Sequence, residues 1–429
     1  MNNNTQYKDS PLGKIPSDWE VKTLESVGHF SKGKGILKDQ LTEIGLPCIR
    51  YGEIYTTYDF IVRNLKSFIS VEVSKESQEI KNGDILFAGS GETTEEIGKS
   101  VAYIGDEKAY AGGDVIILST FESINAEWLS FALETNVARK QKRVLGQGNS
   151  VVHIYPRDLS KIKLLLPPLP EQTCIAEVLS TWDKAISNVL TTIEQVELRN
   201  KWLMQELLTG KRRLKGFEKT TGYHKTELGL KIPIDWVIVK VKDIFKERKE
   251  TSNNQTAFPL FSLTIEKGLT GKTDRYERSF LLKNKEENLY KLIYPEDILF
   301  NPMNLRFGAI TKSKIDKVVS VSAYYNSIYL NYINADVDYF EYLFKTPVFI
   351  NLYDRIAIGS LIEKKRVHLS NFLELEIPLP NKGEQTSIAQ VLQAADKEVQ
   401  VLRSKLEKLK EQKKGLMQML LTGKKRLKI

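Results

Sequence analysis

The amino-acid sequence predicts a tandem duplication of a mixed α/β (α+β) domain, with each copy followed by one long helix. A shift of 213 residues lays Glu171 to Lys215 on Glu384 to Lys428 without a gap, and nearly half of the paired positions are identical. Both repeated segments also carry an apolar heptad, over Ile175 to Leu207 and Ile388 to Leu420, with one polar interruption in each. Such a long period excludes a solenoid, whose units recur about every 20 to 50 residues, and indicates two large modules in tandem.

Shorter echoes extend the duplication over most of the chain. The motifs Lys14 to Trp19, Gly83 to Phe87 and Pro168 to Pro170 return as Lys231 to Trp236, Glu296 to Phe300 and Pro378 to Pro380. Between these anchors the two halves diverge, so a shared frame carries different loops. We therefore predict a first domain over 1–166, a first helical region over 167–217, a second domain over 218–376 and a second helical region over 377–429.

The composition indicates a protein with a polyanionic partner. The formal net charge of the 429 residues is +9, and residues 381–429 alone hold twelve Lys or Arg against five Asp or Glu. An excess of this kind is typical of nucleic-acid binding, although solvated helix faces are often basic. No apolar run approaches the roughly 18 residues of a membrane span, so we expect no membrane partner and a cytoplasmic location.

Cysteine and histidine give no sign of a metal site or of a disulfide framework. Cys48 and Cys174 are far apart in the sequence, and Cys174 matches a serine in the repeat. The four histidines are His29, His153, His224 and His368, and their spacing fits no ligand pattern. We expect each of them to be structural or solvent-exposed, and we predict no bound metal.

The repeated segments predict two long coiled-coil helices. In the first, expected from Thr173 to Leu208, apolar residues recur with alternating spacings of 4 and 3, and the second copy keeps the same spacing. A sustained period of 3.5 residues favours left-handed helix pairing. The polar interruptions Asn200 and Lys413 occupy equivalent positions, where they either specify register and partner or mark a water-filled defect. The predicted pairing residues are Trp182, Ile186, Val189, Ile193, Asn200, Val399, Leu402, Leu406, Leu409 and Lys413.

Each predicted helix ends at a shared signal. Gly210 and Gly423 suit the left-handed position after a helix end, and a basic cluster follows each glycine. These clusters either interact with the helix dipole or contact phosphate. A helix from Thr173 to Leu208 measures about 54 Å, the axial length of about 16 base pairs. We expect such a helix to act as a spacer.

Period-2 apolar segments and longer periodic segments predict the elements of the two domains. The expected strands are Asp84 to Ala88, Val101 to Ile104, Val115 to Leu118 and Ile162 to Leu166, and the expected helices are Ala126 to Val144 and Val337 to Arg355.

The order of these features resembles one known family. A variable domain precedes P-P-L-P-E-Q-x-x-I-A-x-V-L at 167–179 and a helix that ends in L-L-T-G-K-R-R-L at 207–214, and the whole arrangement then repeats. This is similar to the specificity subunit of Type I restriction-modification systems. The resemblance implies two target recognition domains, each reading one half of an asymmetric bipartite site in double-stranded DNA. It also implies an antiparallel helix pair that spaces these domains and docks two modification subunits.

The same resemblance implies that catalysis belongs to partner subunits. The methyltransferase partners are expected to supply S-adenosylmethionine-dependent adenine methylation, and restriction subunits are expected to use ATP and Mg²⁺. The chain itself offers no catalytic residue and no cofactor site. Its nearest approach to the base-binding loop of an adenine methyltransferase is Asn301-Pro302-Met303-Asn304, which lacks the second proline and the aromatic residue, so we interpret it as a loop.

DNA contacts are expected in the divergent loops, where long polar side chains can reach base edges. In the first half, the predicted DNA-binding residues are Lys32, Lys34, Arg50, Tyr51, Ser90, Lys99, Arg139, Lys142, Arg143, Gln147 and Asn149. In the second half, they are Lys272, Arg275, Arg278, Asn304, Arg306, Tyr324, Asn326, Lys364, Lys365 and Arg366. These assignments are regional.

Two other classes of function fit part of the sequence. A free-standing, duplicated DNA-binding regulator would show the same charge and repeat but would need no enzyme partner. A coiled-coil adaptor would explain the heptads but not why paired domains share a frame while their loops diverge.

Overall fold

The computed structural model describes residues 6–148, 151–218, 222–225, 231–265, 267–271, 289–359, 361 and 365–427. The chain divides into two compact units. Unit 1 comprises Met1–Leu190 with Ser404–Ile429, and unit 2 comprises Thr191–Arg403. Each unit therefore contains one mixed domain and a part of both long helices.

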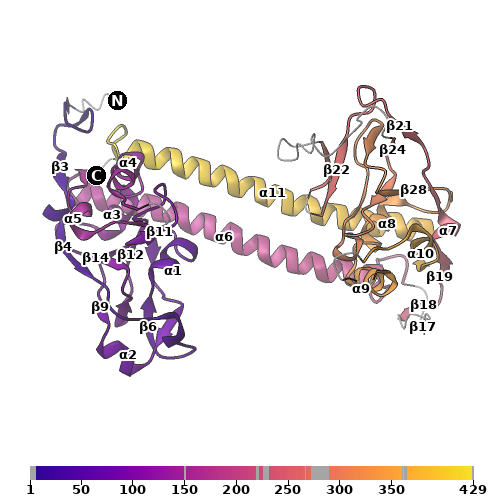
Figure 1. Cartoon of the computed structure of the whole chain (residues 1–429), viewed down its shortest axis with the longest axis horizontal. Helices are drawn as coiled ribbons and strands as arrows, with labels where there is room; N and C mark the ends of the chain where they lie inside the picture. Colours follow the sequence, from indigo (N-terminus) through magenta and orange to yellow (C-terminus); the bar gives the residue numbers. More distant parts are fainter. Residues whose placement is uncertain are drawn as a thin grey trace. The chain divides into compact units, whose positions relative to one another are not determined.

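The two predicted helices are confirmed as α6 (Leu169–Leu208) and α11 (Lys382–Leu420). Within unit 2, Arg403 of α11 donates to Glu197 of α6, while Asn200 of α6 donates to the carbonyl of Ala395. Residue numbers thus fall on one helix as they rise on the other, so the helices are antiparallel. They run side by side in Figure 1, where α6 is pink and α11 is yellow. The predicted seam residues are buried or half-buried.

Unit 1 is built on two five-stranded mixed sheets. The central sheet has the order β4 (Gly28–Lys32), β14 (Val115–Thr120), β10 (Asp84–Ala88), β12 (Ser100–Tyr103), β7 (Ile61–Val62). The second has the order β5 (Leu41–Thr42), β8 (Ser67–Ile69), β6 (Leu46–Ile49), β13 (Ala109–Ala111), β9 (Gln78–Ile80). The strands predicted around residues 84–88, 101–104 and 115–118 are confirmed, and all three lie in the central sheet.

The central sheet of unit 1 is covered on both faces, which explains its continuous apolar strands. On one face, Ile85 and Phe87 pack in a cluster with Trp128 and with Leu179 of α6. On the other face, Leu86 and its neighbours pack with a second cluster around Ile54, in the short helix α1 (Tyr51–Thr56). Because both faces of such a strand are buried, its sequence does not alternate between apolar and polar residues.

Unit 2 repeats this frame with shorter sheets. Its main sheet has the order β20 (Phe245–Glu247), β28 (Asn326–Leu330), β25 (Ile298–Phe300), β26 (Ile310–Lys312). A three-stranded sheet has the order β21 (Thr251–Ser252), β24 (Tyr290–Ile293), β27 (Val319–Val321), and β22 (Phe261–Thr264) pairs with β23 (Gly268–Gly271). The core surrounds Phe300, Phe340 and Phe344, and it includes Leu207 of α6 and Ile388 of α11.

Two predicted helices are each divided in the structure. The helix expected over 126–144 consists of α3 (Ala126–Ala132) and α4 (Asn136–Leu145), and the helix expected over 337–355 consists of α8 (Val337–Leu343) and α9 (Pro347–Ile356). Thr135 and Thr346 have extended backbones and cap the second helix of each pair with their side chains. Because each threonine begins a new helix, the apolar periodicity seen in the sequence spans two helices and not one. The single-helix predictions were wrong at these positions.

One antiparallel strand pair links each domain to its following helix. In unit 1, β3 (Glu20–Thr23) pairs with β16 (Lys163–Leu166), and in unit 2, β19 (Val237–Lys240) pairs with β29 (Glu376–Leu379). The strand predicted over 162–166 is confirmed. In each unit, the last strand before the long helix therefore pairs with a strand near the start of the domain.

The repeated Glu-Gln motif lies at these helix starts. The Gln172 side chain accepts from the Asn125 backbone at 2.9 Å and donates to the Pro167 carbonyl at 2.9 Å. Gln385 accepts from the Asp336 backbone at 2.9 Å and donates to the Pro380 carbonyl at 2.8 Å. The motif therefore joins each long helix to the start of α3 or α8.

The glutamate of the motif is the buried member of an ion cluster, which we call the Arg426 cluster in unit 1. Arg426 bonds both carboxylate oxygens of Asp18, at 2.9 and 2.8 Å, and also contacts Glu171, which is 0% exposed. The indole of Trp19 donates to Glu171 at 2.8 Å. Beside it, Gly423 has φ +69°, and a Cβ there would lie 2.5 Å from Pro16. The segment after α11 therefore packs on the start of the first domain.

Unit 2 contains the same arrangement, the Arg213 cluster. Arg213 bonds Asp235 at 2.9 and 3.0 Å and Glu384 at 2.7 Å, and Trp236 donates to Glu384 at 3.1 Å. Gly210 has φ +66° and would place a Cβ 2.4 Å from Pro233. The predicted glycine ends of both helices are confirmed. The predicted alternatives for the basic residues, helix dipole or phosphate, do not hold for Arg213 and Arg426, because both bind carboxylates.

Replacing either cluster arginine by methionine should strongly destabilise its unit. Arg426→Met leaves the Glu171 carboxylate buried without a cation, which costs about 3–5 kcal/mol, and Arg213→Met should cost as much. Urea unfolding of the full chain, followed by tryptophan fluorescence, measures the change. The exposed neighbour Lys425 provides the control, because Lys425→Met should stay within about 0.5 kcal/mol of the parent. Equal stability of the Arg426 and Lys425 variants would contradict a stabilising role for the cluster.

Candidate nucleic-acid interface

Loops of unit 1 meet at one edge of the central sheet, where β4 and β10 end and β14 begins. The Gly33 amide donates to Val115 at 2.8 Å, Gly89 donates to Asp114 at 2.8 Å, and Ile154 donates to Gly89 at 3.0 Å. A Cβ on Gly33 would lie 1.9 Å from the carbonyl oxygen of Gly112, so only glycine allows this close approach. We call this surface the unit 1 loop edge.

Several predicted DNA-binding residues lie on or beside the unit 1 loop edge. Lys32, Lys34 and Tyr51 are exposed, and Arg50 packs with its side chain against the Gly112 backbone. The ammonium of Lys32 lies 5.5 Å from the ring centroid of Tyr155, a residue that the sequence did not single out. Lys32 and Tyr155 come from separate segments and form a basic and aromatic contact at this edge.

Two predicted contacts, Ser90 and Lys142, are buried and therefore wrong, and a third, Lys99, is half-buried and stays a prediction. Ser90 is 4% exposed and bonds His153; Lys142 is 2% exposed and donates to Glu134 and to the Gly98 carbonyl. The Lys99 ammonium donates to carbonyls at the end of α1, at 2.8 and 3.2 Å. Burial lowers the pKa of Lys99. Ser90 and Lys142 therefore do not reach the surface, whereas Lys99 is half-buried with its ammonium bound to backbone carbonyls.

The remaining candidates of unit 1 are exposed but partly paired. Arg139 bonds Glu134 at 2.9 Å and Arg143 bonds Glu95 at 2.8 Å, yet both side chains remain more than half exposed. Burial opposes the charge of Glu134, but Lys142 and Arg139 outweigh it and lower the pKa of this carboxyl. Gln147 is exposed. Asn149 lies outside the described residues.

The candidates of unit 2 differ in their surroundings. Arg306 bonds Asp354 at 3.2 Å and is mostly buried against Phe307, while Asn304 and Tyr324 are exposed. Asn326 is half-buried in β28. Lys365 is half-buried and Arg366 is exposed; Lys272, Arg275, Arg278 and Lys364 lie outside the described residues. Residues 301–304 form the predicted loop, in which the Asn304 amide donates to the Asn301 carbonyl.

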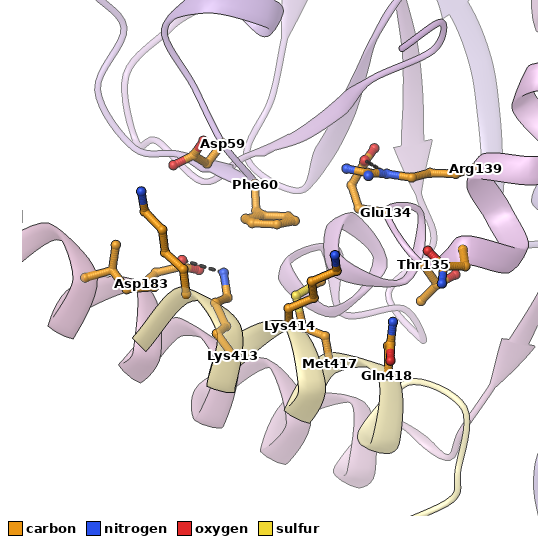
Figure 2. A pocket seen from close by; sticks show the side chains of 13 residues that line it. Asp59, Phe60, Glu134, Thr135, Arg139, Asp183, Lys413, Lys414, Met417 and Gln418 are labelled. Carbon is orange, nitrogen blue, oxygen red and sulfur yellow. Dashed lines mark hydrogen bonds and ion pairs between the residues drawn. The ribbon is translucent and has the colours of Figure 1, made fainter. Parts of the chain in front are cut away.

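A second feature of each unit is a groove between its domain and the helix pair. The unit 1 groove has a volume of about 380 Å³ and is lined by Phe60, Glu134, Asp183, Lys413 and Met417, among others. Figure 2 shows Lys413 beside Asp183, with the Phe60 ring above them. Lys413 forms an ion pair with Asp183 and lies 4.0 Å from the Phe60 centroid. Burial lowers the pKa of Lys413 and raises that of Asp183.

The unit 2 groove has a volume of about 390 Å³ and is formed by matching positions with different chemistry. Asn200 replaces Lys413 and bonds the Ala395 carbonyl at 2.9 Å. Asp396, the match of Asp183, accepts from the Tyr342 hydroxyl at 2.7 Å. Both polar interruptions of the seam therefore have protein partners, which favours the predicted role in pairing over a water-filled defect.

Comparison with known proteins decides the family. The pattern described as the Type I restriction modification DNA specificity domain matches residues 16–198 and 233–411, more than half of the chain. The chain belongs to this family. It is 28% identical to a Methanocaldococcus jannaschii protein assigned as the MjaX type I restriction enzyme specificity subunit, covering 98% of this chain and 97% of that one. It is 24% identical to the MjaVIII specificity subunit of the same organism, covering 98% and 96%.

Solved structures of Type I specificity proteins share the fold. The S subunit of the M. genitalium Type I restriction-modification system aligns with a TM-score of 0.58 at 14% identity, covering 98% of this chain and 97% of that chain. A chain from a study of complex assembly in the type I R-M system aligns with a TM-score of 0.58 at 15% identity, covering 95% and 99%. The resemblance and the fold class predicted from the sequence are confirmed.

Among the residues that the structure describes, no group of His, Cys, Asp and Glu could hold a metal ion. Within that same part of the chain, no helix combines the length and the apolar character needed to cross a bilayer. Sequence reasoning missed His153 and Tyr155 at the unit 1 loop edge. The repeat contained a usable signal, because the shift of 213 residues places His153 opposite the predicted contact Arg366.

We expect Lys413→Ala to destabilise unit 1 by about 2–3 kcal/mol. This is less than the ~3–5 kcal/mol for breaking a fully buried pair, because the Asp183 side chain is 33% exposed. The double variant Lys413→Met with Asp183→Asn removes both charges and should unfold within about 1 kcal/mol of the parent. Lys414→Met, on an exposed lysine of the same groove, is the control for urea unfolding. A double variant as unstable as Lys413→Ala would contradict the ion-pair explanation.

Proposed function

We propose that the chain recognises DNA for a Type I restriction-modification complex and reads an asymmetric, bipartite site with its two domains. The observation that carries the proposal is the duplicated frame. Both copies match a DNA specificity family, while the loops that they present differ in length, charge and side chains. Two readers with different surfaces on one scaffold suit a site whose halves differ in sequence.

In this proposal, the divergent loops of each domain contribute phosphate contacts and base contacts. Exposed cations such as Lys32, Lys34 and Arg143 would bind phosphates, which position the domain without reading sequence. Side chains held by the backbone frame would hydrogen-bond to base edges. The net charge of +9 supports binding to a polyanion.

We further propose that methylation and cleavage are carried out by partner subunits, with none of the chemistry in this chain. Two modification subunits would bind, one at the groove of each unit, and restriction subunits would join that assembly. S-adenosylmethionine, ATP and Mg²⁺ would belong to these partners. Support comes from the matching positions that line the two grooves, such as Lys414 and Lys201 or Met417 and Met204. A chromosomal DNA target would make the cytoplasm the working compartment.

The alternatives are less well supported. A free-standing regulator would not need two matching grooves beside a helix pair, and an adaptor would not need loops that differ between the two domains. A spacer role for the paired helices stays a prediction from their length.

Native mass measurement tests the partner proposal. The full chain, mixed with an excess of one modification subunit from the same system, should form a complex with two copies of that subunit. A stable complex with one copy, or none at any ratio, would contradict two equivalent docking sites.

Exchange of one domain tests the reading proposal. Residues 28–161 would be replaced by the matching segment of a relative, which keeps Asp18, Trp19, β3 and β16 and therefore the Arg426 cluster. Methylation sequencing of DNA modified by the assembled complex should show a change in one half-site only. The reciprocal exchange of residues 245–374 should change only the other half-site. A change in both half-sites from either exchange would rule out two independent readers.

A further inference from the structure

We propose that His153 in unit 1 and Arg366 in unit 2 are equivalent base-reading residues, each donating to a base edge in its own half-site. This inference rests on the proposed function and deepens it, because it names the side chains that would discriminate bases.

The backbone around the two positions is held by the same hydrogen bonds. Gln147 and His153 exchange amide-to-carbonyl bonds of 2.9 and 2.7 Å, and Ile358 and Arg366 exchange bonds of 2.9 and 3.1 Å. The next residue then pairs with the neighbouring loop: Ile154 donates to Gly89 at 3.0 Å, as Val367 donates to Pro302 at 2.9 Å. The two residues therefore occupy one site of the shared frame.

The alternation of strand side chains directs both residues away from the core. Val152 and Ile154 are each 2% exposed, so His153 between them projects from the opposite face of the strand. Val367 is 0% exposed and Arg366 beside it is exposed. A backbone held by hydrogen bonds, with a side chain that points outward, suits a residue that must contact one base edge.

The imidazole of His153 is oriented through one of its two ring nitrogens. Its Nδ1 lies 2.9 Å from the hydroxyl of Ser90, which is 4% exposed, so a buried group fixes the ring. Its Nε2 makes no hydrogen bond with any residue that the structure describes. Tyr155 stacks beside the ring at 6.5 Å, and Lys32 lies over Tyr155. A protonated Nε2 can donate one hydrogen bond to the N7 of a purine.

Arg366 differs from the arginines that support the fold. Arg213, Arg306 and Arg426 each bind carboxylates, whereas Arg366 forms no ion pair within the described part of the chain. Its planar guanidinium suits the O6 and N7 of guanine, which accept two parallel hydrogen bonds. At the same site of the shared frame, His153 would donate one hydrogen bond to a base in unit 1 and Arg366 would donate two in unit 2. Such a difference is expected if the two half-sites differ in sequence.

Methylation sequencing with the complete methyltransferase complex tests the assignment. His153→Ala should increase methylation of sites with a wrong base at one position of one half-site about 5- to 10-fold relative to the cognate site. Arg366→Ala should do so about 10- to 100-fold at one position of the other half-site. Arg366→Lys keeps the charge but loses the planar guanidinium that donates two parallel hydrogen bonds. It should therefore reduce base discrimination at the same position of the half-site. All remaining positions should keep their discrimination.

His29→Ala is the matched control. His29 lies on β4 of the same domain, where it contacts Phe121 and pairs with Ser119 of β14, and its replacement should leave the methylation motif unchanged. Thermal unfolding followed by circular dichroism reports folding. If His153→Ala does not fold, the base-reading assignment is tested by the methylation motifs of His153→Gln and of the two Arg366 variants, whose side chain is exposed.

Uniform loss of methylation at all sites, with unchanged discrimination, would overturn the proposal and assign both residues to phosphate contact or to loop structure. Unchanged discrimination in folded Arg366→Ala and Arg366→Lys would overturn it as well. Failure of the proposed function looks different, because the parent complex would then methylate no bipartite motif at all.

Discussion

A buried carboxylate that must be neutralised is the constraint on which each unit depends. Glu171 and Glu384 are almost fully excluded from water, and an unpaired charge there would be costly. Arginine binds each carboxylate, and a tryptophan indole completes the set of donors. Burial raises the pKa of Glu384, and the bond from Arg213 opposes that shift. Because arginine, tryptophan and glutamate come from three distant segments, the cluster joins the end of one long helix, the start of a domain and the start of the other long helix.

The seam between the long helices contains a chemical difference between the two halves of the chain, at Lys413 and Asn200. The two arginine clusters use the same residue types, so they cannot by themselves distinguish one half from the other. Lys413 and Asn200 can, because their surroundings differ. Lys413 pairs with Asp183 beside the Phe60 and Phe131 rings. In unit 2 the matching carboxylate, Asp396, accepts from the Tyr342 hydroxyl, and Asn200 donates to a backbone carbonyl. A polar residue in an apolar seam favours the pairing that satisfies it. The asymmetry therefore makes the end of α11 fit unit 1 through the Asp183 carboxylate and the Phe60 ring.

Some of the positive charge of the chain stabilises the fold and is not available for binding a partner. Lys142 and Lys312 are buried in ion pairs, and Arg248 binds Asp297 while its guanidinium lies 4.4 and 4.3 Å from the Tyr294 and Tyr329 rings. Net charge therefore indicates a polyanionic partner without identifying the surface that meets it. The shared backbone bonds at His153 and Arg366 are more informative, because they separate the constant frame from the variable side chain.

The sequence alone determined the duplication, the paired helices, the glycine ends and the family, because each depends on local periodicity or on motifs that repeat. It also contained Thr346-Pro347, a local signal for a new helix that a purely periodic interpretation overlooks. Only the tertiary structure decided that Lys142 faces Glu134, that Arg426 binds Asp18 and that the His153 imidazole is oriented by Ser90. Each of these contacts joins side chains from two different segments of the chain. The spacing of residues within one segment does not indicate which side chain of another segment will lie next to it in the fold.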